Sequence, residues 1–225
     1  LAKIEAELSR TIAGVTKVVG DIANTVAAEI RAPYNMAGLI VGGVQQIASL
    51  AATPFEALRL YKGLFDAGSG GSVIPHTTRQ RRQQAQATHA LHELVRTSAV
   101  IEAARTASSA DFASSNEALA LRTDLLAALD ARLSALDPVS GEPIDADLFD
   151  SLRALRAAMV EDFRLRAAKL PQITTYTPKA MIPARLIAWQ LYGDAARAEE
   201  IVNRNNIRHP LFVPGGQALE VLTDA

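Results

Sequence analysis

The sequence predicts a mostly α-helical protein that ends in a small module with the order strand, helix, helix, strand. Of the 225 residues, 49% are hydrophobic but only 5% are aromatic, and alanine and leucine dominate, which favours helices. Several apolar stripes recur at helical spacing. After Pro171 the alanine-rich pattern gives way to β-branched and turn-forming residues, which indicates a separate terminal module.

Composition limits what the chain can be. A net charge of -1 gives no overall electrostatic reason to expect nucleic acid. The absence of cysteine excludes disulfides and thiolate zinc sites, so nothing indicates an oxidising compartment. The chain begins at Leu1 within a stretch typical of a helix interior. We therefore expect a piece of a longer protein with a further N-terminal domain.

The N-terminal region, residues 1–66, is predicted to contain a helical hairpin. The first helix has a single apolar stripe with a mean spacing of about 3.7 residues, and Pro33 ends it. A second helical region covers about 35–65 and breaks or restarts at Pro54. Its apolar run at 36–44 is far shorter than the about 20 residues of a membrane span. Gly38 and Gly42 share one face. The stripe consists of Ile4, Leu8, Ile12, Val15, Val19, Ile22, Val26 and Ile30.

Residues 67–78 are glycine-rich and predict a linker. Residues 79–170 then predict three helices joined by short loops, which favours an antiparallel bundle. Ser114 and Glu117 form a capping-box signature before the second helix. The second helix should bury Leu119, Leu126, Leu129, Leu133 and Leu136, and the third should bury Leu148, Leu152, Leu155, Met159 and Phe163.

Residues 173–222 predict the terminal module. A strand at 173–177 is followed by a helix with Pro183 in its first turn. Asp194 should cap a second helix, and a Pro-Gly-Gly turn should lead to a last strand at 217–222. Two strands alone are marginal in water, so such a unit gains stability by docking on a partner. We expect its core to come from Leu186, Trp189, Ile201, Val202 and Leu219.

This order of elements resembles the lysin motif. One departure concerns residues 179–186, where the sequence KAMIPARL replaces the G-D-T-L-like stretch that glycan-binding members carry after the first strand. The residues that match the motif and that we take as the core and docking residues of the module are Tyr176, Leu186, Trp189, Tyr192, Asp194, Ile201, Asn205, Pro214, Gly215 and Leu219. Gly193, Pro210 and Val213 also match the motif.

A wider stretch, AWQLYGDAARAEEIVNRNNIRHPLFVPGGQALEVL, is similar to the C-terminal signature of the DNA-circularisation (tail assembly) proteins of Mu-like contractile-tailed phages. The resemblance implies a structural protein of the tail baseplate, made in the host cytoplasm and incorporated into the virion. It would join the central hub or tube to surrounding baseplate wedge or sheath proteins. Tail symmetry implies a homo-oligomeric ring of about six copies, with roughly three as the alternative.

Other functions are weaker predictions. No motif indicates an enzyme or a cofactor, and His89 with His92 lacks a third metal ligand at a suitable spacing. Arg79, Arg81 and Arg82 form the most concentrated basic cluster, which makes binding of phage DNA ends the first alternative. Peptidoglycan binding by the lysin-motif-like module is the second alternative.

Overall fold

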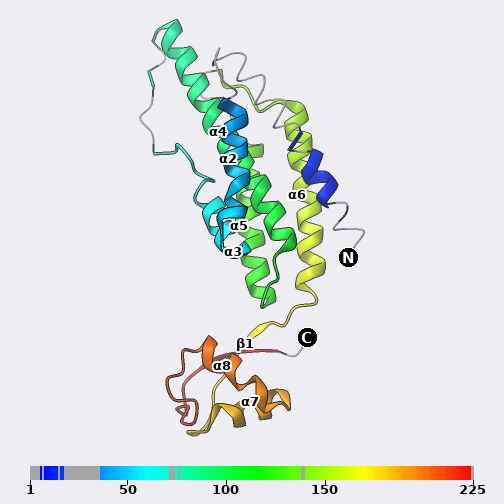
Figure 1. Ribbon diagram of the computed structural model, residues 1–225, viewed down its shortest axis with the longest axis vertical. Coiled ribbons are helices and arrows are strands. Elements are labelled where there is room, and N and C mark those ends of the chain that lie inside the picture. The colour runs from blue at the N-terminus through cyan, green and yellow to red at the C-terminus, as the bar shows by residue number, and fades with distance from the viewer. Residues whose placement is uncertain are drawn as a thin grey trace. The chain divides into compact units, whose positions relative to one another are not determined.

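The computed structural model describes residues 6, 8–14, 16, 17, 36–70, 74, 75, 77–137 and 140–223 (Figure 1). The chain divides into two compact units. The helical unit comprises Leu1–Asp111 and Ala120–Leu165, and the terminal unit comprises Phe112–Leu119 and Arg166–Ala225. The predicted boundaries at residues 66, 78 and 170 stay predictions.

Most of the chain is helical, and the predicted fold class is confirmed. The helix α4 packs against both α2 and α3. Ion pairs join Glu93 of α4 to Arg132 near the end of α5, and Asp130 of α5 to Arg156 of α6. A short segment, 110–114, connects α4 to α5. The ion pair between Glu93 and Arg132 therefore requires these two helices to run in opposite directions. The helices are α2 (Met36–Leu50), α3 (Pro54–Lys62), α4 (Arg79–Ser109), α5 (Ser115–Leu133) and α6 (Ala146–Ala167).

Short polar side chains begin three of these helices, of which the sequence predicted the one at Ser114. The Thr53 hydroxyl accepts a hydrogen bond from the Glu56 amide, so Pro54 starts a new helix. Thr78 caps α4 in the same way. At α5 the Ser114 hydroxyl accepts from the Glu117 amide at 3.3 Å, which confirms the Ser114–Glu117 capping interaction.

The predicted apolar stripes are correct in part. Leu8 and Ile12 of the first stripe are buried, and the other members of that stripe and Pro33 lie outside the described residues. In α6 the predicted Leu152, Leu155, Met159 and Phe163 are buried.

The prediction for α5 is wrong in detail. Leu125 and Leu129 are its fully buried leucines, whereas Leu119 and Leu136 are exposed. The buried face of α5 is therefore centred on Leu125 and Leu129, which are four residues apart. The predicted set of buried leucines included Leu129 but not Leu125. Leu136 lies beyond the end of the helix at Leu133.

Part of the predicted linker is packed on α4. The Arg96 guanidinium donates a hydrogen bond to the Ala67 carbonyl at 2.7 Å. Gly68 has a positive φ of 78°, and a Cβ there would lie 2.3 Å from Nδ1 of His92. Glycine is thus required at position 68 for both its backbone conformation and its close approach to α4. In α2, by contrast, a Cβ at Gly42 would meet open space.

The terminal unit has the predicted order of strand, helix, helix and strand. Strands β1 (Ile173–Tyr176) and β2 (Leu219–Leu222) pair antiparallel, with Ile173 opposite Leu222. Between them lie α7 (Ala184–Tyr192), the 3-10 turn η1 (Ala195–Arg197) and α8 (Ala198–Arg204). Gly193 ends α7 in the left-handed conformation, and the Asp194 carboxylate accepts from the Ala196 amide. Asn116 also accepts from the Ile173 amide, which fixes the start of β1.

Two side chains attach β2 to the helices. The Asn205 amide group donates to the carbonyls of Ile201 and Glu220 and accepts from the Glu220 amide, at 2.8 to 2.9 Å. The Tyr192 hydroxyl accepts from the Leu222 amide at 3.1 Å. These bonds pair edge groups of β2 that a two-stranded sheet leaves without a ladder partner.

The core of the terminal unit differs from the expectation. Ile201 and Leu219 are fully buried, and Val202 is packed against them, as predicted. The expectation that Leu186 and Trp189 lie in the core is wrong, because they are 40% and 61% exposed. Helix α7 instead buries a face of small and branched residues at a spacing of three and four, namely Ala184, Ile187 and Ala188.

We expect Asn205→Ala to loosen the terminal unit by about 1–2 kcal/mol, because it removes two hydrogen bonds to Glu220 of β2 and one to the Ile201 carbonyl of α8. Hydrogen-exchange mass spectrometry should show faster exchange of the Glu220 amide than in the wild type. The matched control is Asn203→Ala on the exposed side of the same helix. Equal protection in both variants would contradict the assigned role of Asn205.

A buried carboxylate in the helical unit gives a pH prediction. Glu102 is 4% exposed, and burial raises its pKa, although Arg105 at 3.2 Å and Gln45 oppose the rise. The folded state therefore holds a proton to higher pH than the unfolded state does. Between the ordinary and the raised pKa, the free energy of unfolding must fall as pH increases, by at most about 1.4 kcal/mol per pH unit.

Glu102→Gln removes this titration, so the variant's stability should decline less than the wild type's as pH rises from acid to neutral. Urea unfolding at several pH values, followed by circular dichroism, measures the difference. Parallel pH profiles for the two proteins would show that Glu102 does not titrate in this interval.

Candidate docking surface

Two chain segments far apart in sequence lie side by side in the terminal unit. Ile182 and Val213 exchange two backbone hydrogen bonds, at 3.2 and 3.1 Å. The Ala184 amide donates to the Pro210 carbonyl at 2.7 Å, and the Gly216 amide donates to the Pro178 carbonyl at 2.7 Å. Residues 178–184 and 210–216 therefore form a short antiparallel ribbon that leads into α7.

Glycine is needed where the two segments cross most closely. A Cβ at Gly215 would lie 2.7 Å from the Cα of Ala180, which is closer than real contacts allow. Gly216 follows with a positive φ of 79°. The Pro-Gly-Gly turn that the sequence singled out thus holds the ribbon together.

Side chains alternate across this ribbon. Val213 is fully buried and Ile182 packs on the core, so their neighbours Met181 and Phe212 point the other way. Met181 and Phe212 are 64% and 63% exposed. On the adjoining helix, burial of the Ile187 side turns Leu186 and Trp189 outward.

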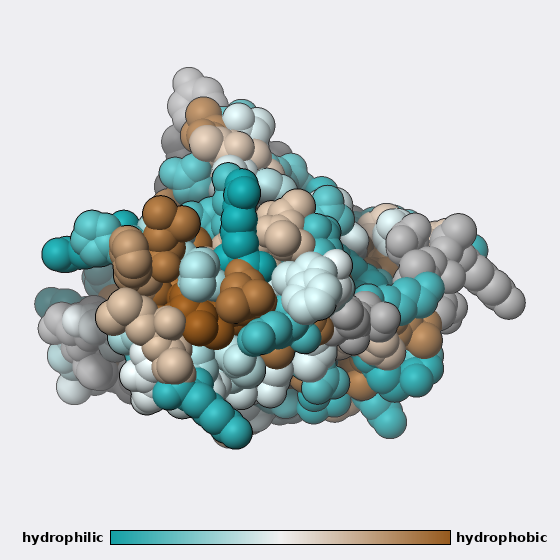
Figure 2. Space-filling view, turned by 90° about the horizontal axis from the view of Figure 1, so that it is seen from below, coloured by the Kyte–Doolittle hydropathy of each residue, from teal (hydrophilic) through white to brown (hydrophobic). Residues whose placement is uncertain are grey.

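The result is an exposed set of large apolar side chains on one small unit, which we call the apolar face. Figure 2 shows apolar side chains gathered close together on the surface, with hydrophilic side chains projecting around them. Large exposed apolar patches typically mark interaction sites. The apolar face consists of Met181, Leu186, Trp189, Leu211 and Phe212.

The remaining residues of the predicted module site have structural positions. Ile201 and Leu219 are in the core. Tyr176 and Tyr192 are half-buried, and the Arg197 guanidinium lies 3.7 Å from the centre of the Tyr192 ring. The other four make the cap, the strand contact and the turn described above: Asp194, Asn205, Pro214 and Gly215. Sequence reasoning named Leu186 and Trp189 for the core and did not name Met181, Leu211 or Phe212.

The predicted basic cluster lies at the start of α4. Arg79, Arg81 and Arg82 are all exposed, within the first turns after the Thr78 cap. Arg79 and Arg82 are three positions apart and share one face of the helix, whereas Arg81 points in another direction.

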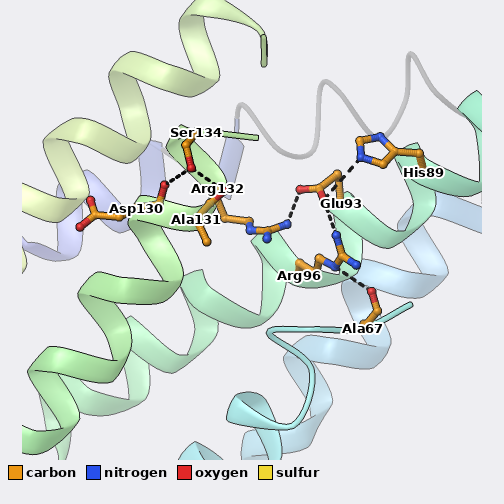
Figure 3. A network of polar contacts seen from close by, with 8 residues as sticks. All are labelled: Ala67, His89, Glu93, Arg96, Asp130, Ala131, Arg132 and Ser134. Atoms are coloured by element: carbon orange, nitrogen blue, oxygen red, sulfur yellow. Dashed lines mark hydrogen bonds and ion pairs between the residues drawn. The ribbon is translucent and has the colours of Figure 1, made fainter. Parts of the chain in front are cut away.

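A partly buried polar network in the helical unit is the main alternative site (Figure 3). The Glu93 carboxylate pairs with Arg96 at 2.6 Å and with Arg132, while His89 lies 3.7 Å away. Arg96 also holds the Ala67 carbonyl. Two guanidinium groups contact the Glu93 carboxylate, and the network joins α4, α5 and the turn after α3.

Neither a metal site nor a membrane span is found in the part of the chain that the structure describes. No group of three potential ligands comes together among those residues. None of the helices there combines the length and apolarity that crossing a bilayer requires. An open hollow of about 320 Å³ between α2, α3 and α4 is lined largely by alanine, and its charged lining residue is Arg105, which pairs with Glu102.

Comparison with known proteins gives one informative similarity. No protein-family model matches the chain. Over 90 residues the chain is 31% identical to a protein of Haemophilus influenzae named the Mu-like prophage FluMu DNA circularization protein. The match covers 39% of this chain and 20% of the relative, so the chain spans a small part of that protein's length.

The apolar face predicts a contrast between two substitutions in α7. Ile187→Ala should destabilise the terminal unit by about 2–5 kcal/mol, since it removes a fully buried side chain. Trp189→Ala should change stability by about 0.5 kcal/mol or less, because Trp189 is mostly exposed. Amide exchange of β2 measures both effects in the full chain. Comparable losses in the two variants would show that Trp189 belongs to the core.

Proposed function

We propose that this chain is part of a structural protein of a Mu-like phage or prophage tail and that its terminal unit is a docking module. The observation that carries the proposal is the apolar face. A unit with so small a core leaves five large apolar side chains in solvent, which is unfavourable unless another polypeptide covers them. The similarity to the Mu-like prophage protein supports the phage context.

The proposed place is the baseplate region of the virion, after assembly in the host cytoplasm. The helical unit would pack on tail neighbours, and the terminal unit would join hub or tube to the surrounding wedge or sheath proteins. Rotational symmetry favours a ring of about six copies, or roughly three. The proposed role includes no reaction: the buried carboxylate pairs discussed above serve packing, and the apolar face offers no group suited to acid–base or nucleophilic chemistry.

The test uses the phage or prophage that encodes the chain. Mass spectrometry of purified particles should detect the protein at a fixed copy number. The double variant Trp189→Ser/Phe212→Ser should accumulate as a folded protein in the host yet yield few complete tails, because docking is lost while the core is intact. Absence of the wild-type protein from purified virions would reject the structural role.

Binding of phage DNA ends is the second candidate. The exposure of Arg79, Arg81 and Arg82 favours it, as does the printed name of the similar prophage protein. Three arginines neutralise few phosphates, so binding should be weak and should fall steeply with salt. In a mobility-shift assay with linear DNA, replacing all three arginines by alanine should abolish binding if this candidate is correct.

Peptidoglycan binding by the terminal unit stays a prediction that a pull-down on purified peptidoglycan tests.

A further inference from the structure

We propose that the apolar face binds a segment of another protein whose apolar side chains are flanked by aspartate or glutamate. The inference rests on the proposed docking function and adds the chemistry of the partner. It depends on a second feature of the same surface, which is the sign of the charge around it.

The charged residues in the two segments that supply the apolar face are all basic. Residues 177–190 and 205–217, which supply the ribbon and α7, contain Lys179, Arg185, Arg208 and His209 but no aspartate or glutamate. All four side chains are exposed. Arg185 directly precedes Leu186 on α7, and Arg208 and His209 directly precede the ribbon strand that carries Leu211 and Phe212.

No ion pair within the described part of the chain neutralises these cations. Among the described residues no ion pair involves Lys179, Arg185 or Arg208. Elsewhere in the same unit Arg197 pairs with Glu200 at 3.2 Å. An acidic partner would therefore find unpaired positive charge at the rim and apolar surface at the centre, which is the usual arrangement of a protein interface.

A second copy of this chain is a poor occupant of the apolar face. A two-fold contact would place the same surface on both sides. The cations of each copy would then face those of the other, and like charges at an interface cost several kcal/mol. The positive rim thus acts against self-association while it attracts an acidic partner.

Nucleic acid fits the rim but not the centre of this surface. Single strands bind basic grooves with aromatic side chains that stack on bases, and Trp189 and Phe212 could serve in that way. The other three members of the apolar face, Met181, Leu186 and Leu211, are aliphatic and offer no stacking surface. If a phosphate backbone covered these aliphatic side chains, the phosphates would lose their hydrogen bonds to water and gain none in return. A polypeptide with apolar and acidic side chains suits both the apolar face and the basic residues beside it.

The experiment is selection of short linear peptides from a random displayed library on the full 225-residue chain. Enriched peptides should combine aromatic or aliphatic residues with aspartate or glutamate. Trp189→Ser/Phe212→Ser should bind them at least about tenfold more weakly. The charge-reversal variant Lys179→Glu/Arg185→Glu/Arg208→Glu should lose a similar factor and should select lysine- or arginine-containing peptides instead.

The matched control is Arg79→Glu/Arg81→Glu/Arg82→Glu, which changes the net charge equally but lies on α4. It should bind the selected peptides as the wild type does. If the Trp189/Phe212 variant loses binding while charge reversal at Lys179, Arg185 and Arg208 leaves the selected sequences unchanged, the apolar face binds peptides but the proposed preference for acidic partners is wrong. Failure to enrich any peptide rejects this inference, whereas the virion measurement decides the structural function independently.

Two further outcomes would overturn the inference. Binding of a single-stranded oligothymidine that is lost in Trp189→Ser/Phe212→Ser would assign the surface to nucleic acid. Dimerisation of the wild type that the same variant abolishes, measured by sedimentation, would assign it to a second copy.

Discussion

The attachment of β2 to the helices of the terminal unit is the constraint on which its surface depends. A sheet of two four-residue strands is marginal by itself. Asn205 and Tyr192 supply the missing partners for β2, and the ribbon between residues 178–184 and 210–216 closes the other side of the unit. With β2 and the ribbon fixed, the small core has room for Ile187, Ile201, Val213 and Leu219. The larger side chains of the same segments are then left outside.

This arrangement separates stability from interaction within one short stretch of chain. Ile187 and Trp189 are two positions apart on α7, yet one is fully buried and the other is mostly in solvent. The residues on which the resemblance to the lysin motif rests are mostly those that build the Pro-Gly-Gly turn, the helix caps and the contact of Asn205 with β2. Resemblance at those positions therefore supports a shared backbone more strongly than a shared ligand. The side chains that would contact a partner lie between the signature positions, apart from Leu186 and Trp189.

The helical unit uses charge in a different way. A polar network surrounds Glu93, where Arg96 of α4 and Arg132 of α5 contact one partly buried carboxylate. Such a network fixes the relative position of α4, α5 and the preceding turn, and the contact between Gly68 and His92 does the same at shorter range. In the terminal unit, by contrast, the basic side chains beside the apolar face have no acidic partner among the described residues.

The sequence by itself determined the helical class, the caps at Ser114 and Asp194, the buried stripe of α6 and the order of elements in the terminal unit. These follow from local periodicity and from hydrogen bonds within a few residues. Only the tertiary structure decided which side of α7 is buried, and that Leu125 rather than Leu119 or Leu136 packs in α5. It also decided that residues 178–184 meet residues 210–216. A helix of nine residues that has large apolar side chains on more than one side carries little internal signal for its buried face, because that choice depends on which distant segments pack against it.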